Sequence, residues 1–516
     1  MLKDRTYLKQ PGWVALIAAL AAGIGTHLFG LVSVLHNHDD LFVQPAGFGT
    51  GVESGRWFLE VLGRLNRMLF GDYNLPWVNG VLFLVALAIG AGLLVSVLQL
   101  KSRTAAVVIG ALVVVFPSVT AIMFYRFTAI YYGVAAMLAV LAAWVLERYK
   151  KCGLLLSVLC IALSMGIYQA FVPFTISIFV LLMIRKGLQG GTNIWKLVLR
   201  GVYYCVDLIL GLVLYFLLLQ LSLYVFDASL GSYQGIDKMG QLALDQIPGL
   251  VKTAVKYFVM LPTNNYCALA PTGLLKWSYL LLELLSGGMI VYILFTRVKK
   301  LDTVLGTILL VALFPLAANF IVIMAPPSGI NTMTVYSFVV ALCAPFVLLE
   351  ALPPMEGPCL KGAKTVVSRA VAAVTAAIVI SYAYLANVNY TGLYYANRQA
   401  ENYMNSIVVQ VRMTEGFDAE KSWAIFGKIQ DPLLSGQWQN IPFYGGYTST
   451  EGLIRAYSRY SWFFLHTGYN IPLASGEMME ELSGSQEVKD MPCWPTEGSI
   501  RVIGDAVVFK FEEISS

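Results

Sequence analysis

Charged residues are scarce in this chain. They make up 13% of its 516 residues, against about 25% in ordinary soluble proteins. Hydrophobic residues make up 58%, and the mean hydropathy is +0.70. A soluble protein that carried so much apolar sequence would expose large apolar patches. The composition therefore excludes a soluble enzyme and a disordered scaffold, and it predicts an all-α polytopic membrane protein.

Metal-binding and nucleotide-binding motifs are also lacking. The seven cysteines are scattered and form no CxxC pair, so neither a disulfide framework nor a zinc site is indicated. The sequence has no glycine-rich phosphate loop, and we expect no nucleic-acid partner. We expect no metal and no cofactor, with one alternative. His36 and His38 stand beside the acidic pair Asp39-Asp40 and leave room for a divalent metal.

Long apolar runs recur along the first three quarters of the chain. A membrane-spanning helix needs about 20 mostly apolar residues. About eleven segments qualify, and they are 12–35, 77–100, 104–123, 128–146, 153–167, 170–184, 201–226, 274–296, 303–324, 332–350 and 365–386. The fifth and sixth segments are short. No internal repeat is visible, which argues against a transporter built from inverted halves.

Lysine and arginine predict the orientation of these spans. Eighteen of them lie in one set of connections, against eight in the longer loops of the other set. By the positive-inside rule the first set is cytoplasmic. The N-terminus is then cytoplasmic, and the first span is retained rather than cleaved as a signal peptide. Residues 1–386 form a membrane domain whose long outer loops are 36–76 and 227–273.

The composition changes after residue 386. Residues 387–516 contain nine basic and fifteen acidic residues and lack long apolar runs. Their pattern predicts a helix over 392–413 and strand-like runs at Trp423–Ile429 and Ile500–Phe511, with a turn at Gly504-Asp505. We therefore expect a small α+β domain at the C-terminus, on the extracytoplasmic side.

The acidic pair Asp39-Asp40 lies directly after the first span. Adjacent carboxylates at a membrane boundary repel each other, which makes one of them a better proton acceptor. A general base that takes a proton from a sugar hydroxyl needs this property. Carboxylates at a helix C-terminus oppose the helix dipole, so a role as a simple cap is unfavourable. We therefore interpret the pair as a candidate catalytic site.

The first outer loop also contains an amphipathic segment, 54–70. At 100° per residue, Arg56, Glu60, Arg64 and Arg67 share one face, and apolar side chains occupy the other. The segment is expected to be an interfacial helix with Ser54 as its N-cap. Its basic face could bind either a lipid-linked phosphate or anionic lipid headgroups. For Arg56 we favour binding to the phosphate.

Other charged residues offer further candidates. Arg126 lies between aromatic residues in a short outer loop, where it needs an anionic partner. Lys252 and Lys256 are one helical turn apart and form a second possible anion contact. Asp207 and Glu283 are acidic residues within predicted spans. Such residues are typical of transport pathways, so a transporter remains an alternative function.

These motifs resemble the Gtr-type glucosyltransferases that modify O-antigen and related surface glycans. The resemblance rests on five elements in order, which are Asp39-Asp40, Ser54-Gly55-Arg56-Trp57, Phe124-Tyr125-Arg126, Leu163-Ser164-Met165-Gly166-Ile167-Tyr168-Gln169-Ala170, and a closing Met491-Pro492 with Pro495-Thr496-Glu497-Gly498-Ser499-Ile500.

The resemblance implies a GT-C architecture in the bacterial inner membrane. Such enzymes transfer a sugar, here glucose, from a polyprenyl-phosphate donor to a lipid-linked or surface glycan, usually with inversion. By this resemblance Asp39 or Asp40 is the base, and Arg56 and Arg126 hold the donor phosphate. Further substrate-binding candidates are Trp57, Tyr125, Tyr168, Gln169, Lys252 and Lys256.

Two other functions remain as alternatives. A transporter or flippase of lipid-linked glycans would depend on Asp207 or Glu283 rather than on the outer acids. An O-antigen polymerase or ligase would also act through its outer loops, but it would consume diphosphate-linked glycans. The transferase interpretation requires an outward-facing cavity beside Asp39-Asp40.

Overall fold

The structure, a computed structural model, describes residues 10–43, 51–71, 75–149, 151–232, 245–298, 300–324, 330–353, 358–428, 443–455 and 457–514. The chain forms two compact units. The first comprises residues 1–32, 47–387 and 442–445, and the second comprises 33–46, 388–441 and 446–516. The predicted boundary at 386/387 lies next to the observed one at 387/388. Unlike the prediction, the second unit includes residues 33–46, which carry the acidic pair.

Membrane-spanning helices dominate the first unit. Among the described residues, nine helical segments are long and apolar enough to cross a bilayer. They are α1 (Pro11–Val32), α4 (Pro76–Val97), α5 with α6 (Arg103–Met123), α7 (Arg126–Arg148), η3 with α9 (Gln169–Leu188), α10 (Ile194–Val225), α13 (Gly273–Arg297), α14 (Leu301–Ala318) and α17 (Pro358–Met413). The protein is therefore a multi-pass membrane protein.

Two apolar helices are shorter than a full span. They are α8 (Gly153–Ile167) and α16 (Phe338–Ala351), with 15 and 14 residues. Each of the eleven predicted segments overlaps one of these helical segments. Only the later part of the predicted segment 332–350 is α-helical. Its first residues form a 3-10 turn, η6 (Thr332–Thr334). Asn331 caps this turn, and its side chain accepts a hydrogen bond from Met333 N at 2.9 Å.

The predicted span 104–123 is broken into two helices. Helix α5 (Arg103–Val115) ends before Phe116, and α6 (Pro117–Met123) starts at the proline. Proline has no backbone N–H and disfavours helical geometry in the residue before it. Phe116 accordingly has φ −56° and ψ 141°, outside the helical region.

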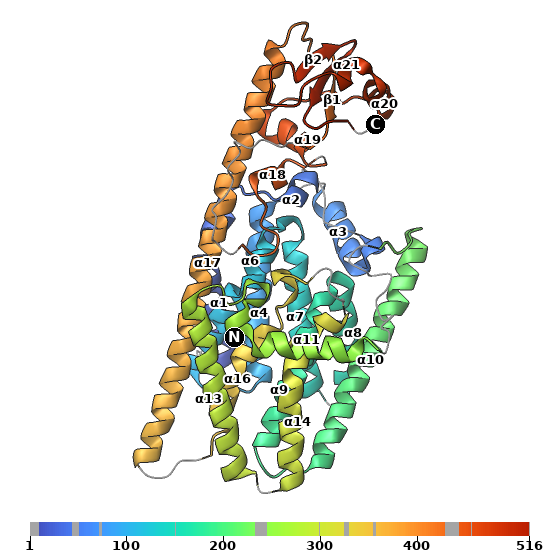
Figure 1. Cartoon of the computed structure of the whole chain (residues 1–516). Coiled ribbons are helices and arrows are strands. Elements are labelled where there is room, and N and C mark those ends of the chain that lie inside the picture. The colour runs from blue at the N-terminus through green and yellow to red at the C-terminus, as the bar shows by residue number, and fades with distance from the viewer. Residues whose placement is uncertain are drawn as a thin grey trace, which may run out of the picture. The chain divides into compact units, whose positions relative to one another are not determined.

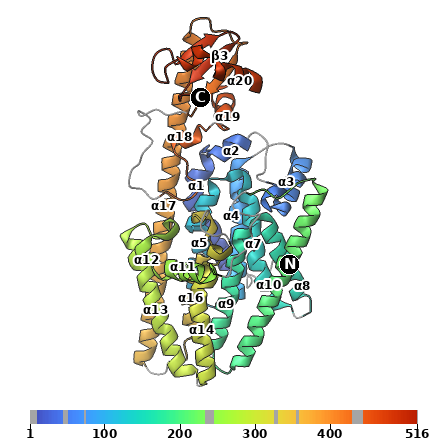
Figure 2. The same ribbon diagram turned by 45° about the vertical axis from the view of Figure 1, so that its right-hand side comes forward.

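Small residues bring the first helices together. Helix α1 packs on α4 and α5, α4 packs on α7, and α9 packs on α14 (Figures 1 and 2). A Cβ atom at Gly110 of α5 would lie 2.3 Å from the backbone oxygen of Ala15 in α1. The glycine therefore permits a backbone approach that any larger residue would prevent, as is typical of helix contacts in membranes.

Helix α17 is continuous over 56 residues, from Pro358 to Met413. Two elements were predicted here, a span at 365–386 and a helix at 392–413, so this part of the prediction was wrong. No proline follows Pro358 within the helix, and asparagine side chains are accommodated by bonds to the preceding turn. Asn387 Nδ2 donates to the carbonyl of Ala383 at 2.9 Å.

The second unit contains a three-stranded sheet in the order β1-β3-β2. Strand β1 (Ser422–Phe426) runs parallel to β3 (Ala506–Lys510), and β2 (Ile500–Ile503) pairs antiparallel with β3. Gly504, with φ 58°, and Asp505 form the β2–β3 turn. The predicted run Ile500–Phe511 and its turn are thus confirmed as a hairpin. The predicted run Trp423–Ile429 forms a strand as far as Phe426, and Ile429 lies outside the described residues. Figures 1 and 2 show the sheet beside the C-terminal part of α17.

Apolar side chains cover both faces of this sheet. Trp423, Val507 and Phe509 pack with Ile407 and Val411 of α17. The other face packs against the helices that precede β2. The remaining helices of the unit are α2 (His38–Val43), α18 (Thr450–Leu453), α19 (Arg459–Trp462), η7 (Phe463–Thr467), α20 (Gly476–Gly484) and α21 (Gln486–Lys489).

The two predicted outer loops contain helices of their own. In the first unit, loop 36–76 includes η2 (Val52–Ser54) and α3 (Trp57–Phe70), and loop 227–273 includes α11 (Ile247–Val259), α12 (Leu261–Asn264) and η5 (Tyr266–Ala268). Helix α3 confirms the predicted amphipathic helix. Val61, Leu65 and Met68 are exposed on it, as expected for a helix that lies in a membrane interface.

Candidate functional site

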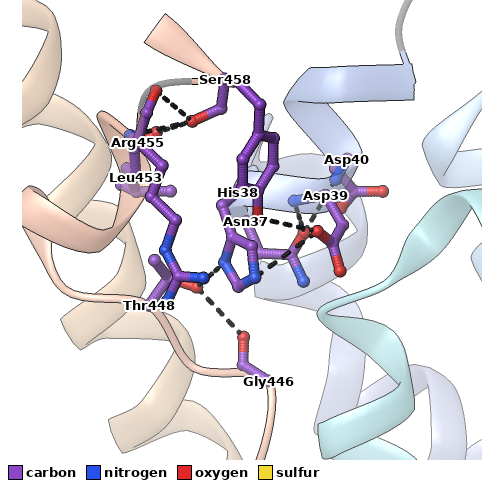
Figure 3. Close-up of polar contacts among 10 residues, drawn as sticks. Asn37, His38, Asp39, Asp40, Gly446, Thr448, Leu453, Arg455 and Ser458 are labelled. Atoms are coloured by element: carbon purple, nitrogen blue, oxygen red, sulfur yellow. Dashed lines mark hydrogen bonds and ion pairs between the residues drawn. The ribbon is translucent and has the colours of Figure 1, made fainter. Parts of the chain in front are cut away.

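The acidic pair lies in the first turn of α2, in the second unit. Helix α1 ends at Val32, and α2 begins at His38. Asn37 Oδ1 accepts hydrogen bonds from the backbone N–H of Asp39 at 3.0 Å and of Asp40 at 2.8 Å (Figure 3). The acids follow the first span, as expected, but the expectation that they lie at the C-terminus of its helix was wrong. They open a separate short helix, where the helix dipole stabilises carboxylates.

Asn397 of α17 binds the backbone of the segment that leads into α2. Asn397 Oδ1 accepts from His36 N, and Asn397 Nδ2 donates to His36 O, each at 3.0 Å. Leu41, further along α2, is fully buried in the core of the second unit. These contacts explain why residues 33–46 belong to the second unit. The sequence does not predict this contact, because His36 and Asn397 are 361 residues apart.

Asp39 and Asp40 differ sharply in exposure. Asp40 is buried, with 1% of its surface exposed, whereas the side chain of Asp39 is 39% exposed. Asp39 Oδ1 accepts a hydrogen bond from the Tyr457 hydroxyl at 3.1 Å and lies 3.5 Å from His38 Nε2. Within the described part of the chain, the Oδ2 atom of Asp39 has no hydrogen-bond partner. Asp39 is therefore the more accessible proton acceptor.

The neighbours of Asp39 keep fixed protonation states near neutral pH. Burial lowers the pKa of His38 and the charge of Arg455 lowers it further, although Asp39 opposes this shift. His38 is therefore neutral at pH 7. Burial, together with the negative charge of Asp39, raises the pKa of Tyr457 to about 12. The phenol thus keeps its proton and donates a hydrogen bond to the carboxylate.

The described residues contain no group of three or more histidine, cysteine, aspartate or glutamate side chains arranged to hold a metal ion. His36 instead packs edge-on against the ring of His466, with centroids 5.1 Å apart. The expectation of no metal and no cofactor stays a prediction.

Arg56 occupies an aromatic site in the first unit. It is the N-cap residue of α3, and its Nη1 donates to the Tyr132 hydroxyl at 2.9 Å. Its guanidinium carbon lies 5.2 Å from the centroid of the Tyr168 ring, within the range of a cation–π contact. The rings of Tyr132 and Tyr168 are stacked, with centroids 4.4 Å apart. The predicted N-cap, Ser54, was wrong, because Ser54 ends η2 and its hydroxyl donates to Gly51 O.

Two of the motifs identified in the sequence meet at this site. Gln169 Nε2 donates to Ser54 O at 3.4 Å and to the Tyr215 hydroxyl at 3.1 Å. The Tyr215 hydroxyl in turn donates to Gly55 O at 3.1 Å. Sequence reasoning missed Tyr215, whose only signal is a lone hydroxyl in an apolar stretch of α10. Gly55 has φ 73°, a conformation that glycine adopts without strain.

The chain matches the family described as Glucosyl transferase GtrII over residues 28–342, which is more than half of its length. The chain belongs to the GtrII glucosyltransferase family. The predicted resemblance is thereby confirmed, and the protein is a membrane glucosyltransferase by family. The comparison with individual curated proteins finds no match.

The GtrII match includes the acidic pair, the Arg56 motif and the Tyr168-Gln169 motif. It ends within α16 and excludes the sheet and residues 446–458 of the second unit. The side chains that surround Asp39 therefore come from two sources. His38 belongs to the matched region, and Thr448 and Tyr457 lie outside it.

Trp57 of the GtrII match is a buried packing residue. Gly166 of α8 lies so close that a Cβ there would be 2.6 Å from Trp57 Cε2 and 2.9 Å from Phe58 Cβ. Gly166→Ala should therefore destabilise this junction by about 1–3 kcal/mol, as overpacking usually does. We expect a lower melting temperature in detergent. Gly25→Ala in α1, where nothing lies within 4 Å, is the control. Equal melting temperatures of the two variants would contradict the packing role.

Arg126 and Tyr125 stand at the start of α7. Arg126 is buried, with 2% of its surface exposed, and its Nη2 donates to the carbonyl of Gly30 in the last turn of α1. Tyr125 is the N-cap residue of α7, and its carbonyl accepts from Thr128 Oγ1 at 3.1 Å. Arg126 thus satisfies a carbonyl at a helix end, which is a structural role. The contact of Arg126 with the donor phosphate stays a prediction.

Lys252 and Lys256 are exposed on α11. Among the described residues, no hydrogen bond or ion pair links either lysine to Arg56 or to its aromatic partners. Helix α11 packs on α14, and Asn319 Nδ2 donates to the Ala254 carbonyl at 3.3 Å. The structure does not bring the two lysines into the Arg56 site, and their contact with substrate stays a prediction.

The intramembrane acids have separate surroundings. Asp207 Oδ2 accepts from the Ser157 hydroxyl at 2.7 Å. Arg200, seven residues before Asp207 in the chain, forms an ion pair with Glu147. Glu283 lines an apolar cavity of about 260 Å³ among α9, α13, α14 and α16. Asp207 and Glu283 share no contact among the described residues, and no proton relay connects them.

Proposed function

We propose that this protein transfers glucose from a polyprenyl-phosphate donor to a hydroxyl of a lipid-linked or cell-surface glycan such as O-antigen, with inversion at the anomeric carbon. It does so as a GT-C enzyme of the bacterial inner membrane. Its active site and C-terminal domain face away from the cytoplasm. Membership of the GtrII family supports glucosyl transfer, and the positive-inside pattern supports the orientation.

Asp39 is the general base of this proposal, and the observation that carries it is the geometry of its carboxylate. Oδ1 is held by the Tyr457 hydroxyl at 3.1 Å, while Oδ2 has no partner among the described residues. An exposed, oriented carboxylate oxygen can accept the proton of an acceptor hydroxyl. Asp40 is nearly fully buried and cannot reach an external hydroxyl without a rearrangement.

The reaction has two coupled changes. The acceptor hydroxyl gives its proton to Asp39 Oδ2, and its oxygen bonds to the anomeric carbon. The bond from that carbon to the phosphate oxygen breaks, and the electron pair stays on the phosphate. A single carboxylate suffices because the phosphate leaves as an anion and needs no protonation by a second carboxyl.

Arg56 is the proposed ligand of the donor phosphate. Its guanidinium is fixed by the Tyr132 hydroxyl at 2.9 Å and by the face of Tyr168. A prefixed guanidinium stabilises negative charge as it accumulates on a leaving phosphate, without reorganisation during the reaction. Helix α3, which begins directly after Arg56, has the exposed apolar side chains expected of a helix at headgroup depth.

The test is glucosyl transfer by the purified protein in detergent. We expect radiolabelled glucose to pass from polyprenyl-phosphate glucose to a lipid-linked glycan acceptor, and we expect no transfer from a nucleotide-glucose. Micelles have no leaflets, so a flippase would form no product. A polymerase or ligase would instead consume a diphosphate-linked oligosaccharide. Either of these two outcomes would contradict the proposal.

A further inference from the structure

The segment 446–458 lies outside the GtrII match, yet it supplies side chains to the candidate base. Tyr457 and Thr448 come from this segment, and both reach α2 across more than 400 residues of sequence. In Figure 3 the ring of His38 lies between Thr448 and Asp39, with Arg455 on the same side as Thr448. All of these residues belong to the second unit.

We propose that Tyr457 is a positioning residue for Asp39 and that His38, fixed by Thr448, is a second one. Together they hold Oδ1 of Asp39, so that Oδ2 faces the acceptor hydroxyl. The C-terminal segment is therefore part of the catalytic apparatus. This inference rests on the proposed function, because it concerns the same base.

Tyr457 is a permanent donor to Asp39. Its hydroxyl lies 3.1 Å from Asp39 Oδ1, and its side chain is only partly exposed. Burial and the charge of Asp39 raise its pKa to about 12, so the phenol does not ionise under physiological conditions. A carboxylate that accepts a hydrogen bond on one oxygen loses rotational freedom. The other oxygen is then held in one direction.

His38 adds a second contact on the same oxygen. Its Nε2 lies 3.5 Å from Asp39 Oδ1, and its Nδ1 lies 3.0 Å from Thr448 Oγ1. The ionised carboxylate favours the tautomer with the proton on Nε2. The Thr448 hydroxyl then donates to Nδ1 at 3.0 Å and shares its proton with the more distant Gly446 carbonyl at 3.4 Å. Because burial keeps His38 neutral, it orients Asp39 without adding a full positive charge beside the base.

Hydrogen bonds among the residues around Tyr457 hold it in place between α18 and α19. The Ser458 hydroxyl donates to Leu453 O at 2.6 Å and accepts from Arg455 N at 3.0 Å. Trp462 Nε1 donates to the same Leu453 carbonyl at 3.2 Å, and Trp462 is fully buried. Neighbours held in this way provide the positional precision that an orienting hydroxyl requires.

The first test compares Tyr457→Phe with Tyr469→Phe in the glucosyl-transfer assay. Tyr469 is an equally exposed tyrosine of the same unit, and it accepts a hydrogen bond from Arg412 Nη1 at 3.0 Å. A hydrogen bond to a charged group justifies an expected loss of about tenfold in kcat for Tyr457→Phe, with unchanged KM for both substrates. Tyr469→Phe should match the wild type.

The pH profile separates positioning from a merely structural role. Among the described residues of this unit, the titratable and charged groups that contact Asp39 or adjoin it are His38, Asp40, Arg455 and Tyr457. Loss of the Tyr457 hydroxyl removes a hydrogen bond to the ionised carboxylate, so the acid limb of the kcat profile should move to higher pH. An unchanged limb together with a wild-type kcat would overturn the inference.

Two further variants keep the inference testable if Tyr457→Phe folds poorly. His38→Gln retains an N–H donor near Asp39 and should keep more activity than His38→Leu. In an Asp39→Asn background, Tyr457→Phe should cause no further loss, because its effect acts through Asp39. A wild-type protein without glucosyl transfer would refute the proposed function. An active wild type with an additive Tyr457→Phe effect, or with equal His38→Gln and His38→Leu, would refute this inference alone.

Discussion

Asp39→Asn should lower kcat for glucosyl transfer by about 10³-fold, within the range that a lost general base usually costs. The amide keeps the shape of the side chain and its contact with Tyr457, but it cannot accept the proton of the acceptor hydroxyl. The KM for the donor should change little. The assay measures transfer of radiolabelled glucose from polyprenyl-phosphate glucose in detergent.

Asp505→Asn is the matched control for this prediction. Asp505 belongs to the same unit, its side chain is 96% exposed, and its nearest charged partner is Lys421 at 3.7 Å. Asp40→Asn tests the choice between the two adjacent acids and should lose less activity than Asp39→Asn. An active Asp39→Asn beside an inactive Asp40→Asn would assign the base to Asp40.

Arg56→Lys should lower kcat/KM by about 10²-fold, the lower end of the cost of losing one charge-stabilising donor. Lysine has no planar fork, so it cannot keep the contacts to Tyr132 and Tyr168 and also present two N–H groups to a phosphate. The loss should fall mainly on kcat if the contact strengthens as the bond to phosphate breaks. Steady-state kinetics with varied polyprenyl-phosphate glucose would measure both parameters.

Arg64→Lys is the control on the same helix. Arg64 is exposed, pairs with Glu60 at 2.7 Å and lies over the ring of Phe226. This variant should keep near wild-type activity. Tyr132→Phe, which removes the hydroxyl that fixes Arg56, should cause a smaller loss than Arg56→Lys. An unchanged kcat/KM in Arg56→Lys would remove Arg56 from the donor site.

Local patterns were sufficient to predict much of the fold. A run of about 20 apolar residues forms a span wherever it occurs, because the lipid core leaves few alternatives. Helix α3 followed from the separation of charged and apolar side chains at 100° intervals. The hairpin of β2 and β3 followed from alternating apolar residues around Gly504-Asp505. The motifs that contain Arg56 and Gln169 were both predicted to be functional. The contact between the two motifs was not predicted.

Tertiary contacts explain what was missed. The hydrogen bonds between Asn397 and His36 join segments 361 residues apart. The hydrogen bond from Tyr457 to Asp39 joins segments 418 residues apart. Neither leaves a local pattern. The continuity of α17 through residues 387–391 depends on asparagine bonds within the helix rather than on apolar periodicity. The short helix α2 depends on the N-terminal cap provided by Asn37. This helix was not predicted, because the acids were assigned to the C-terminal end of the first helix.

The most direct measurement of the central claim uses azide, a nucleophile that needs no deprotonation. Asp39→Asn lacks the base, but its donor site is intact. We expect added azide to restore cleavage of polyprenyl-phosphate glucose in this variant and to give glucosyl azide with the anomeric configuration inverted relative to the donor. Glucosyl azide of retained configuration, or an Asp39→Asn variant that transfers glucose to the glycan at the wild-type rate without azide, would contradict Asp39 as the base.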